Sequence, residues 1–378
     1  MSDILKGVLG GGWALLVGWI MPSAVTVVAF RFLVAPSVPA GWLTQALRLD
    51  VERQGLALLG AAILLGLLLA AVQVPLYRLA EGYVGWHPRP AWSRREMIRH
   101  PVSALLDHSH RRQLDRKHLL VGRRDFVELS QLAEKRTLRP ELMKRLAQVR
   151  ADPRLKPYVE AGWEANLAHL GLLKERARRY PVDDGQVLPT RLGNAIRRLE
   201  EYGYDRYRLD SQLLWYELNS SAPAEARKFA DQARTTLDFL ICLLYGNLMV
   251  AAAAIAALGW AGRERITLGV AAVILIAAAA LWYRVAVVVT DDWAASVRAL
   301  VNLGRKPLAS SMGLDLPSSL ADERDMWAAV SRVAARPYDD LSAQLDPFRA
   351  PPADTSLHVD WRRDTPSATD GDGRLTPG

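Results

Sequence analysis

The stretch GLALLGAAILLGLLLAAVQV, residues 55–74, is apolar almost throughout and carries no charged side chain. An α-helix needs about 20 such residues to cross the hydrocarbon core of a bilayer. Apolar runs of similar length occupy residues 8–30, 237–260 and 266–283. The sequence therefore predicts an all-α integral membrane protein with four transmembrane helices.

The positions of the four runs predict how the helices are grouped. Only residues 261–265 separate the third run from the fourth, so these two must form a tight antiparallel hairpin. The first two runs form another hairpin, and a long charged segment lies between the two. The chain is therefore expected to contain a first transmembrane hairpin (8–76), an inserted helical cytoplasmic domain (77–234), a second transmembrane hairpin (235–290), C-terminal cytoplasmic helices (291–346) and a disordered tail rich in Pro, Asp, Thr and Gly (347–378).

The inserted segment has the periodicity of helices rather than of strands. Residues 130–148 and 158–176 each place apolar side chains at helical spacing, which predicts two amphipathic helices. Thr190 is placed to cap a helix that begins near Arg191. Ser319 and Asp322 have the spacing of a capping box for a short helix in the C-terminal region.

Basic residues close to the spans predict the orientation. Lys and Arg gather after the second run, before the third and after the fourth, whereas acidic neighbours balance the few on the opposite side. Cytoplasmic flanks of membrane helices carry such an excess. The insert and both termini are therefore expected in the cytoplasm. No cleavable signal peptide is expected, because the first run is too long for a signal core.

The net charge of +8 has two interpretations. In a soluble protein, a basic balance would make nucleic acid a candidate partner. Here the basic residues flank membrane helices, where they face an anionic leaflet. We therefore expect the lipid bilayer and its anionic head groups as partners, and no nucleic acid.

The sequence contains no motif for catalysis or for a cofactor. A nucleophile elbow, a P-loop and a dinucleotide fingerprint are all absent, and the single cysteine, Cys242, lies inside the third run. His108, His110 and Asp107 come nearest to a metal site, but arginines crowd the same stretch and repel a cation. We therefore expect no enzyme, no cofactor and no metal.

Three blocks of the sequence resemble a known family. They are PLYRLAEGYVG (75–85), LPTRLGNAIRRLEEYGYDRYRLDSQLLWYEL (188–218) and WAASVRALVNLGRKPLASSMGLDLPSSLADERDMW (293–327). Together they resemble a family of uncharacterised bacterial multi-pass membrane proteins. The resemblance spans most of the chain from the second run onward, and the PTRLGN…EEY…DRY pattern of the middle block is its most specific part. It implies a bacterial plasma-membrane protein without an established activity, and it assigns no catalytic residues.

The middle block also supplies the candidate site residues. Arg191, Asn194, Arg198 and Glu201 fall on one predicted helix, followed closely by several aromatic side chains. They can form a structural polar network over those aromatic residues, which is the favoured interpretation. Alternatively, Arg191 and Arg198 bind a phosphate-bearing lipid head group.

Two polar residues lie within the third apolar run. Asp238 is near its start, and Asn247 is about midway. Ionisable groups inside a membrane are candidates for a transport pathway. Positions such as these also serve at the interface or in helix packing, so both interpretations stay open.

These observations favour a non-enzymatic scaffold or signalling platform that acts through its cytoplasmic domain and a possible protein partner. The alternative is a channel or transporter. Four helices with so little polarity cannot line an aqueous pore alone, so this alternative needs a homo-oligomer. An enzyme acting on lipids rests only on the His and Arg clusters and is the weakest hypothesis.

Overall fold

A computed structural model describes residues 12–38, 50–84, 101–260, 264–336 and 345–350. Within these ranges the chain is helical, and a single isolated β-bridge joins Leu314 to Arg349. Four helices are long and apolar enough to cross a membrane: Gly12–Leu33, Val51–Ala71 (α4), Ala224–Ala257 (α14) and Arg265–Ser311 (α15). The predicted all-α fold with four candidate spans is therefore confirmed. Residues 8–11 of the first run lie outside the described ranges.

The first span changes its helical winding next to a proline. A π-helical turn, η1 (Leu16–Ile20), leads directly into α2 (Met21–Leu33), whose second residue is Pro22. Proline lacks an N–H and its ring crowds the preceding turn. The wider π-helical turn just before it accommodates both effects.

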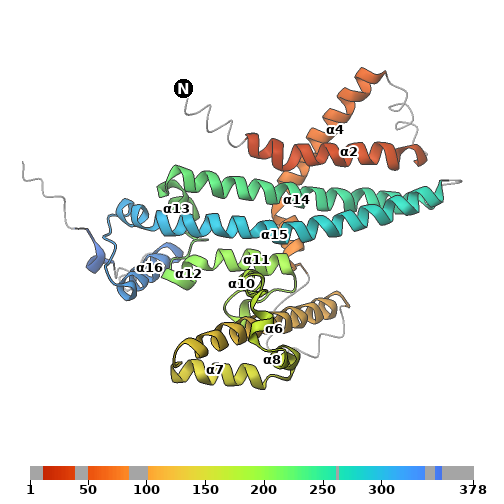
Figure 1. Ribbon diagram of the computed structural model, residues 1–378. Coiled ribbons are helices and arrows are strands. Elements are labelled where there is room, and N and C mark those ends of the chain that lie inside the picture. The colour runs from red at the N-terminus through yellow and green to blue at the C-terminus, as the bar shows by residue number, and fades with distance from the viewer. Residues whose placement is uncertain (1–11, 39–49, 85–100, 261–263, 337–344, 351–378) are drawn as a thin grey trace, which may run out of the picture.

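The helix α4 crosses the first span at a glycine. A Cβ on Gly66 would lie 2.9 Å from the Cα of Ile20, so only glycine lets the two backbones meet there. Beyond the crossing, α2 and α4 diverge toward the Val51 end of α4 (Figure 1). On that side the two hairpins stay linked, because the Ser37 hydroxyl donates to the Glu264 carboxylate.

The second hairpin consists of α14 and α15, which lie side by side over most of their length (Figure 1). Small side chains let membrane helices approach closely. The buried contact in the part farthest from the inserted domain is made by Val250, Ala251, Ala254 and Ala257 of α14 with Leu268, Ala272 and Leu275 of α15. The tight hairpin predicted from the short connection is confirmed.

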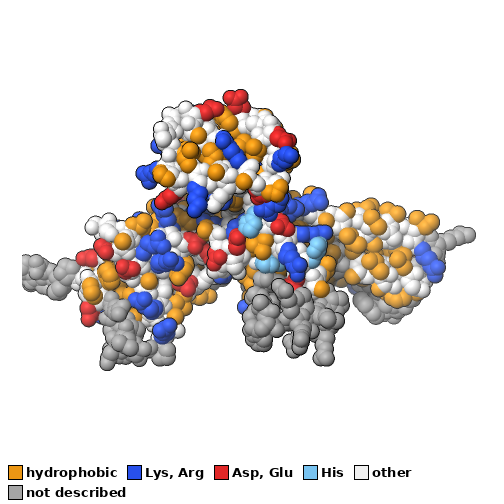
Figure 2. Space-filling view, turned by 90° about the horizontal axis from the view of Figure 1, so that it is seen from below, with side chains coloured by type: hydrophobic (Ala, Val, Ile, Leu, Met, Phe, Trp, Pro, Cys, Tyr) orange, Lys and Arg blue, Asp and Glu red, His pale blue; other side chains and the backbone are white. Residues whose placement is uncertain are grey.

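Both helices of this hairpin continue far beyond the hydrocarbon. With 34 and 47 residues, α14 and α15 are about 50 and 70 Å long, against a hydrocarbon core of about 30 Å. The expected domain boundaries after residues 234 and 290 therefore fall inside continuous helices. The chemical character of the surface changes along the molecule (Figure 2). Hydrophobic side chains cover one end up to a basic tip, and charged side chains are frequent over the rest of this face.

The inserted domain packs on the extension of α15. The helix α11 (Arg191–Glu200) lies along α15, and a lobe built from α6, α7 and α10 lies beside α11 (Figure 1). The helices of this domain are α5 (Gln73–Glu81), α6 (Pro101–Lys135), α7 (Pro140–Ala151), α8 (Lys156–Glu160), α9 (Trp163–Leu167), α10 (Leu170–Arg178), α11, α12 (Tyr202–Tyr207) and α13 (Trp215–Ser221), with short 3-10 turns η4 (Pro153–Leu155) and η5 (Asp184–Gln186).

Two helices predicted in this domain are wrong in extent. Residues 130–148 contain the end of α6 and most of α7, because Arg139 precedes a proline and is extended, and Pro140 starts the new helix. Residues 158–176 are divided among α8, α9 and α10. Gly162 breaks this stretch with a φ of 81°, a conformation that glycine adopts without strain.

The C-terminal helices pack on the far extension of α15. Ser319 caps α16 (Leu320–Ala335) by accepting from the N–H groups of Ala321 and Asp322, as its spacing predicts. Trp327 is fully buried in the core beneath this helix. The expected tail begins later than residue 347, because η6 (Asp346–Phe348) and the residues after it bond to the 313–315 backbone. Residues 351–378 lie outside the described ranges.

Candidate functional site

The segment LPTRLGN, residues 188–194, docks α11 onto the chain that leaves the first hairpin. The Thr190 hydroxyl donates to the backbone carbonyl of Glu81 at 2.8 Å and accepts from the Gly193 N–H at 3.0 Å, so the predicted cap is confirmed. A Cβ on Gly193 would lie 2.3 Å from the same carbonyl oxygen. The start of α11 is therefore held directly against the end of α5.

Asn194 holds the turn that precedes α11. Its side-chain amide donates to the backbone carbonyls of Leu188 at 2.9 Å and Thr190 at 2.7 Å. Its side-chain carbonyl accepts from the Leu188 N–H at 2.7 Å. The residue is 1% exposed, and buried backbone groups need such partners. Asn194 therefore shapes the turn and is not accessible to a ligand.

Tyr283 links the start of α11 to the fourth span. The Leu192 N–H donates to the Tyr283 hydroxyl at 3.2 Å, and the Leu192 side chain is fully buried. Tyr283 is the last residue of the fourth apolar run, and Arg284 follows it. The N-terminus of α11 therefore lies where the hydrocarbon ends, on the side that carries the inserted domain.

Five arginines line a cavity of about 250 Å³ at this level, which we call the arginine pocket. Their side chains come from four parts of the fold: α6, the end of α10, the start of α11 and the middle of α15. Aromatic and aliphatic residues form the rest of the wall. The pocket is lined by Arg116, Arg176, Arg179, Arg191 and Arg284, with Leu120, Tyr180, Tyr283, Val287 and Val288.

Most of these guanidinium groups have no acidic partner among the described residues. Arg179 pairs with Asp291 at 2.6 Å and with Glu175 at 2.5 Å. The other four arginines of the pocket form no ion pair with any residue that the structure describes. Burial and the repulsion of neighbouring arginines lower the pKa of the Arg116 guanidinium, against an opposing effect of Tyr180. A guanidinium nevertheless stays charged at neutral pH, so the pocket is strongly positive.

The pocket has the chemistry of an anion site next to an apolar surface. Arginine binds phosphate through two parallel N–H donors, and several arginines can share its oxygens. The N-terminus of α11 adds a partial positive charge. Tyr283, the last residue of the fourth apolar run, also lines the pocket, so the pocket borders the apolar part of α15. This arrangement fits a phosphate that is attached to something hydrophobic.

The structure separates the four residues singled out in the middle block. Arg191 lines the arginine pocket. Arg198 pairs with Asp205 at 2.8 Å, and Glu201 pairs with Arg197 at 2.8 Å. The structural-network interpretation therefore describes the geometry of Asn194, Arg198 and Glu201, whereas the head-group interpretation fits Arg191.

Sequence reasoning missed the other four arginines of the pocket. They come from segments that are far apart in the chain and rich in basic residues, so nothing in the sequence distinguishes them from solvated surface charges. The one usable signal was the position of Arg284 directly after the fourth apolar run.

The two polar residues of the third span have partners within the chain. Asp238 is 7% exposed and accepts a hydrogen bond from the Tyr77 hydroxyl at 2.7 Å. The Asn247 amide donates to the Leu243 carbonyl of its own helix at 2.9 Å. Asp238 thereby ties α14 to α5 at the end of the membrane span.

A second polar cavity, of about 380 Å³, lies on the other side of α11 between α5, α14 and α15. Glu81 and Glu200 line it together with Arg78 and Arg234. Burial, with the negative charge of Glu200 as the next cause, raises the pKa of Glu81 to about 7. This carboxyl group therefore loses its proton only near neutral pH.

We expect Glu81→Gln to stabilise the protein at pH 8 and not at pH 4. The pKa of Glu81 is higher in the folded state than its ordinary value of 4.5, so its contribution to stability is fully present below about pH 4.5 and is lost as the pH rises from there through about 7. The gain in unfolding free energy at pH 8 should be about 2 kcal/mol. This is less than the energy that corresponds to the full pKa shift, because water still reaches the Glu81 carboxyl group. Unfolding free energies in detergent micelles at both pH values measure it. Glu141→Gln, on the exposed surface of α7, is the control, and equal gains for Glu81→Gln at the two pH values would contradict the assignment.

No metal-binding group is found among the residues that the structure describes: no three His, Cys, Asp or Glu side chains come together there. His108 and His110 both lie in α6, and His118 of the same helix contacts Asp184 at 2.7 Å. Asp184 also accepts from Lys117, at 2.6 Å. Asp184 is therefore already engaged by Lys117 and His118 of α6.

Known proteins offer no guide to the role of this site. No protein-family model, curated protein or solved structure matches this chain. The resemblance of the three sequence blocks to a family of bacterial membrane proteins therefore stays a prediction. What the chain does must be argued from the arginine pocket and its place at the membrane.

Proposed function

We propose that this chain is an integral protein of the bacterial plasma membrane whose arginine pocket holds the phosphate of an anionic lipid head group. The inserted domain, facing the cytoplasm, then serves as a non-enzymatic platform for a protein partner. The observation that carries the proposal is the set of four arginines at the end of the fourth span that have no carboxylate partner within the described part of the chain.

The depth of the pocket favours a lipid phosphate over a soluble one. Arg284 follows the apolar run directly, and about 20 residues of helix, from residue 266 onward, bring it to the edge of the hydrocarbon. Lipid phosphates are concentrated at that level. Each basic residue near an anionic membrane surface gains about 1 kcal/mol from its field. Four such residues around one cavity can therefore select an anionic lipid from a mixture.

The same charges support a cytoplasmic location for the inserted domain. Arg284 of the pocket is one of the basic residues that flank the second, third and fourth spans. An excess of this kind marks the cytoplasmic side, and the cytoplasmic leaflet is the anionic one. A pocket for an anionic head group on this side is consistent with both rules.

Exposed aromatic side chains outside the membrane support the platform part of the proposal. Tyr216 in α13 is 84% exposed, and Phe229, in the polar extension of α14, is 58% exposed. Tyrosine and phenylalanine are enriched in protein interfaces. The change of both residues to serine should release a co-purifying protein partner while membrane insertion stays intact.

The pocket is tested by counting lipids on the purified chain. We expect the wild type to enrich phosphatidylglycerol over phosphatidylcholine when it is released from nanodiscs containing equal amounts of both and analysed by native mass spectrometry. Arg116→Gln/Arg191→Gln should reduce that enrichment at least about tenfold, because it removes two charge-assisted contacts to the phosphate. Arg139→Gln/Arg150→Gln, at exposed positions just before α7 and in its last turn, removes the same charge and should change nothing.

Two results would overturn the proposal. Equal enrichment by the wild type and by the pocket variant would show that the five arginines do not bind the lipid. Release of phosphatidylglycerol by millimolar inorganic phosphate, added to the protein in nanodiscs, would assign the pocket to a soluble anion instead. Retention of the lipid under that challenge is the expected outcome.

A further inference from the structure

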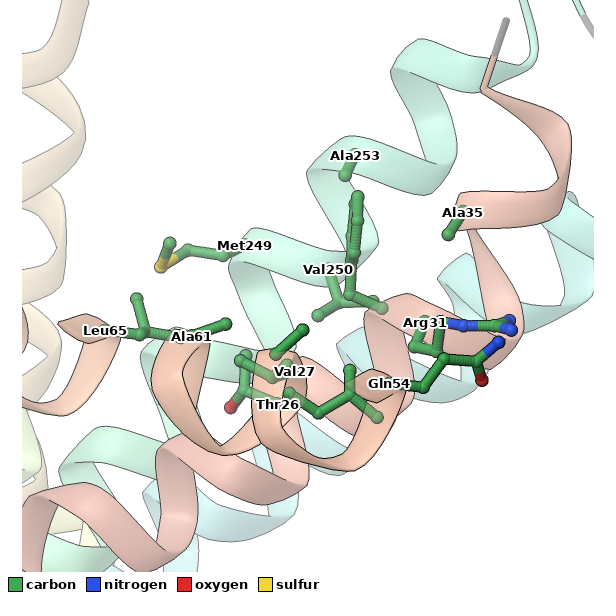
Figure 3. A pocket seen from close by; sticks show the side chains of 13 residues that line it. Thr26, Val27, Arg31, Ala35, Gln54, Ala61, Leu65, Met249, Val250 and Ala253 are labelled. Carbon is green, nitrogen blue, oxygen red and sulfur yellow. The ribbon is translucent and has the colours of Figure 1, made fainter. Parts of the chain in front are cut away.

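A third cavity lies inside the membrane part of the molecule. Its volume is about 460 Å³, and it lies between α2, α4 and α14 in the half of the membrane away from the inserted domain. Figure 3 shows Arg31 and Gln54 at one end of this cleft and Leu65 and Met249 at the other. The end marked by Arg31 is close to the outer end of α2, so it lies near the membrane surface opposite the inserted domain.

The cleft follows from how the helices cross. The helix α4 touches the first span where Gly66 meets Ile20, and α14 touches α2 where Gly246 meets Thr26. From these close contacts α2 and α4 diverge toward the Val51 end of α4 (Figure 1). A wedge therefore opens between them, with α14 behind it, and Ala57 and Ala61 of α4 are too small to fill it.

The walls of the cleft are apolar and one end is cationic. The Thr26 hydroxyl is turned to the Pro22 carbonyl at 3.1 Å, so it offers the cleft no free donor. Arg31 forms no ion pair with any residue that the structure describes, and its guanidinium lies 5.5 Å from the centre of the Phe32 ring. A positive group at the membrane surface and an apolar trough below it match the two parts of a phospholipid.

The dimensions of the cleft suit a single acyl chain. From Gln54 to Leu65, α4 rises about 16 Å. Spread over that length, 460 Å³ corresponds to a cross-section of about 30 Å², which is enough for one extended acyl chain.

We propose that this cleft binds one phospholipid of the leaflet opposite the inserted domain. One acyl chain lies between α2 and α4 against Met249 and Val250, and the phosphate meets Arg31. This lipid is distinct from the one in the arginine pocket, because the two sites lie near opposite membrane surfaces. The cleft requires a phosphate and an acyl chain but no net negative charge on the lipid.

The test counts the phosphatidylcholine molecules that stay bound to a variant whose arginine pocket no longer binds lipid. The full chain carrying Arg116→Gln/Arg191→Gln is purified from phosphatidylcholine nanodiscs into mild detergent and analysed by native mass spectrometry. We expect one retained phosphatidylcholine per chain. Ala61→Trp, which fills the cleft, should lower its occupancy at least about tenfold, and Arg31→Gln should lower it severalfold. Ile274→Trp, on the lipid-exposed face of α15, is the matched control and should leave it unchanged.

The outcomes separate this inference from the proposed function. Equal occupancy in the Ala61→Trp and Ile274→Trp chains would overturn it, whatever the arginine pocket does. Equal retention of a diacylglycerol, which lacks the phosphate, would overturn the role of Arg31. If Ala61→Trp does not fold, Ala57→Phe fills the same cleft from the next turn of α4 and should cause the same loss.

Discussion

Gly193→Ala is expected to destabilise the protein by about 3 kcal/mol, although alanine is the better helix former. Helix propensity alone would favour alanine by about 1 kcal/mol at this position in α11. The new Cβ would lie 2.3 Å from the carbonyl oxygen of Glu81, a backbone atom that cannot move away as a flexible side chain would. Overpacking of this kind typically costs about 1–3 kcal/mol, and we expect the upper end here.

A matched glycine in the same domain provides the control. Gly171 lies in α10, and a Cβ there would meet nothing within 4 Å. Gly171→Ala should therefore stabilise the protein by up to about 1 kcal/mol. Chemical unfolding of both variants in mixed micelles measures the two values. The same sign for both would show that α11 does not dock tightly on α5. Gly193→Ala should also weaken lipid selection, because α11 positions Arg191.

Glu323→Leu is expected to destabilise the C-terminal helices by about 3–5 kcal/mol. Glu323 is 5% exposed and forms a double contact with Arg305, with both N–O distances 2.5 Å. It also accepts from the indole of Trp327 at 3.3 Å, and Arg305 lies over the ring of Tyr207 at 4.5 Å. Removal of the carboxylate leaves the Arg305 charge partly buried without a partner.

The paired substitution is the control for this prediction. Arg305→Met/Glu323→Leu removes both charges and keeps similar volumes, so it should lie within about 1 kcal/mol of the wild type. The comparison uses the unfolding free energies of the two variants in the same micelles. If the double variant were as unstable as Glu323→Leu, the loss would come from packing rather than from the unpaired charge.

The membrane part of the fold follows from patterns that the sequence carries locally. Residues 55–74 are apolar almost throughout. In the bilayer such a segment must satisfy its own backbone N–H and C=O groups, and an α-helix does so. Thr190 and Ser319 were recognised as caps for a similar reason, because a cap depends on residues within one turn of the helix. Where Gly162 interrupts an otherwise helical stripe, local backbone preference overrides the apolar spacing, and the predicted helix is wrong in extent.

The candidate site depends on contacts that a single sequence does not reveal. Arg191 was identified because its neighbours form a distinctive block. Arg116, Arg176 and Arg284 became part of the same site only when α6, α10 and α15 came together around α11. The cleft beside Arg31 depends on the angle at which α4 crosses α2, which follows from the packing at Gly66 and not from hydrophobicity.

The most direct test of the central claim is a structure of the full chain determined in nanodiscs that contain phosphatidylglycerol. We expect a lipid phosphate in the arginine pocket, within hydrogen-bond distance of Arg116 and Arg191, with its acyl chains directed past Tyr283 toward the fourth apolar run. If all five guanidinium groups were instead well ordered, with only water between them or with carboxylates of the protein as partners, the claim that this site binds a lipid head group would be contradicted.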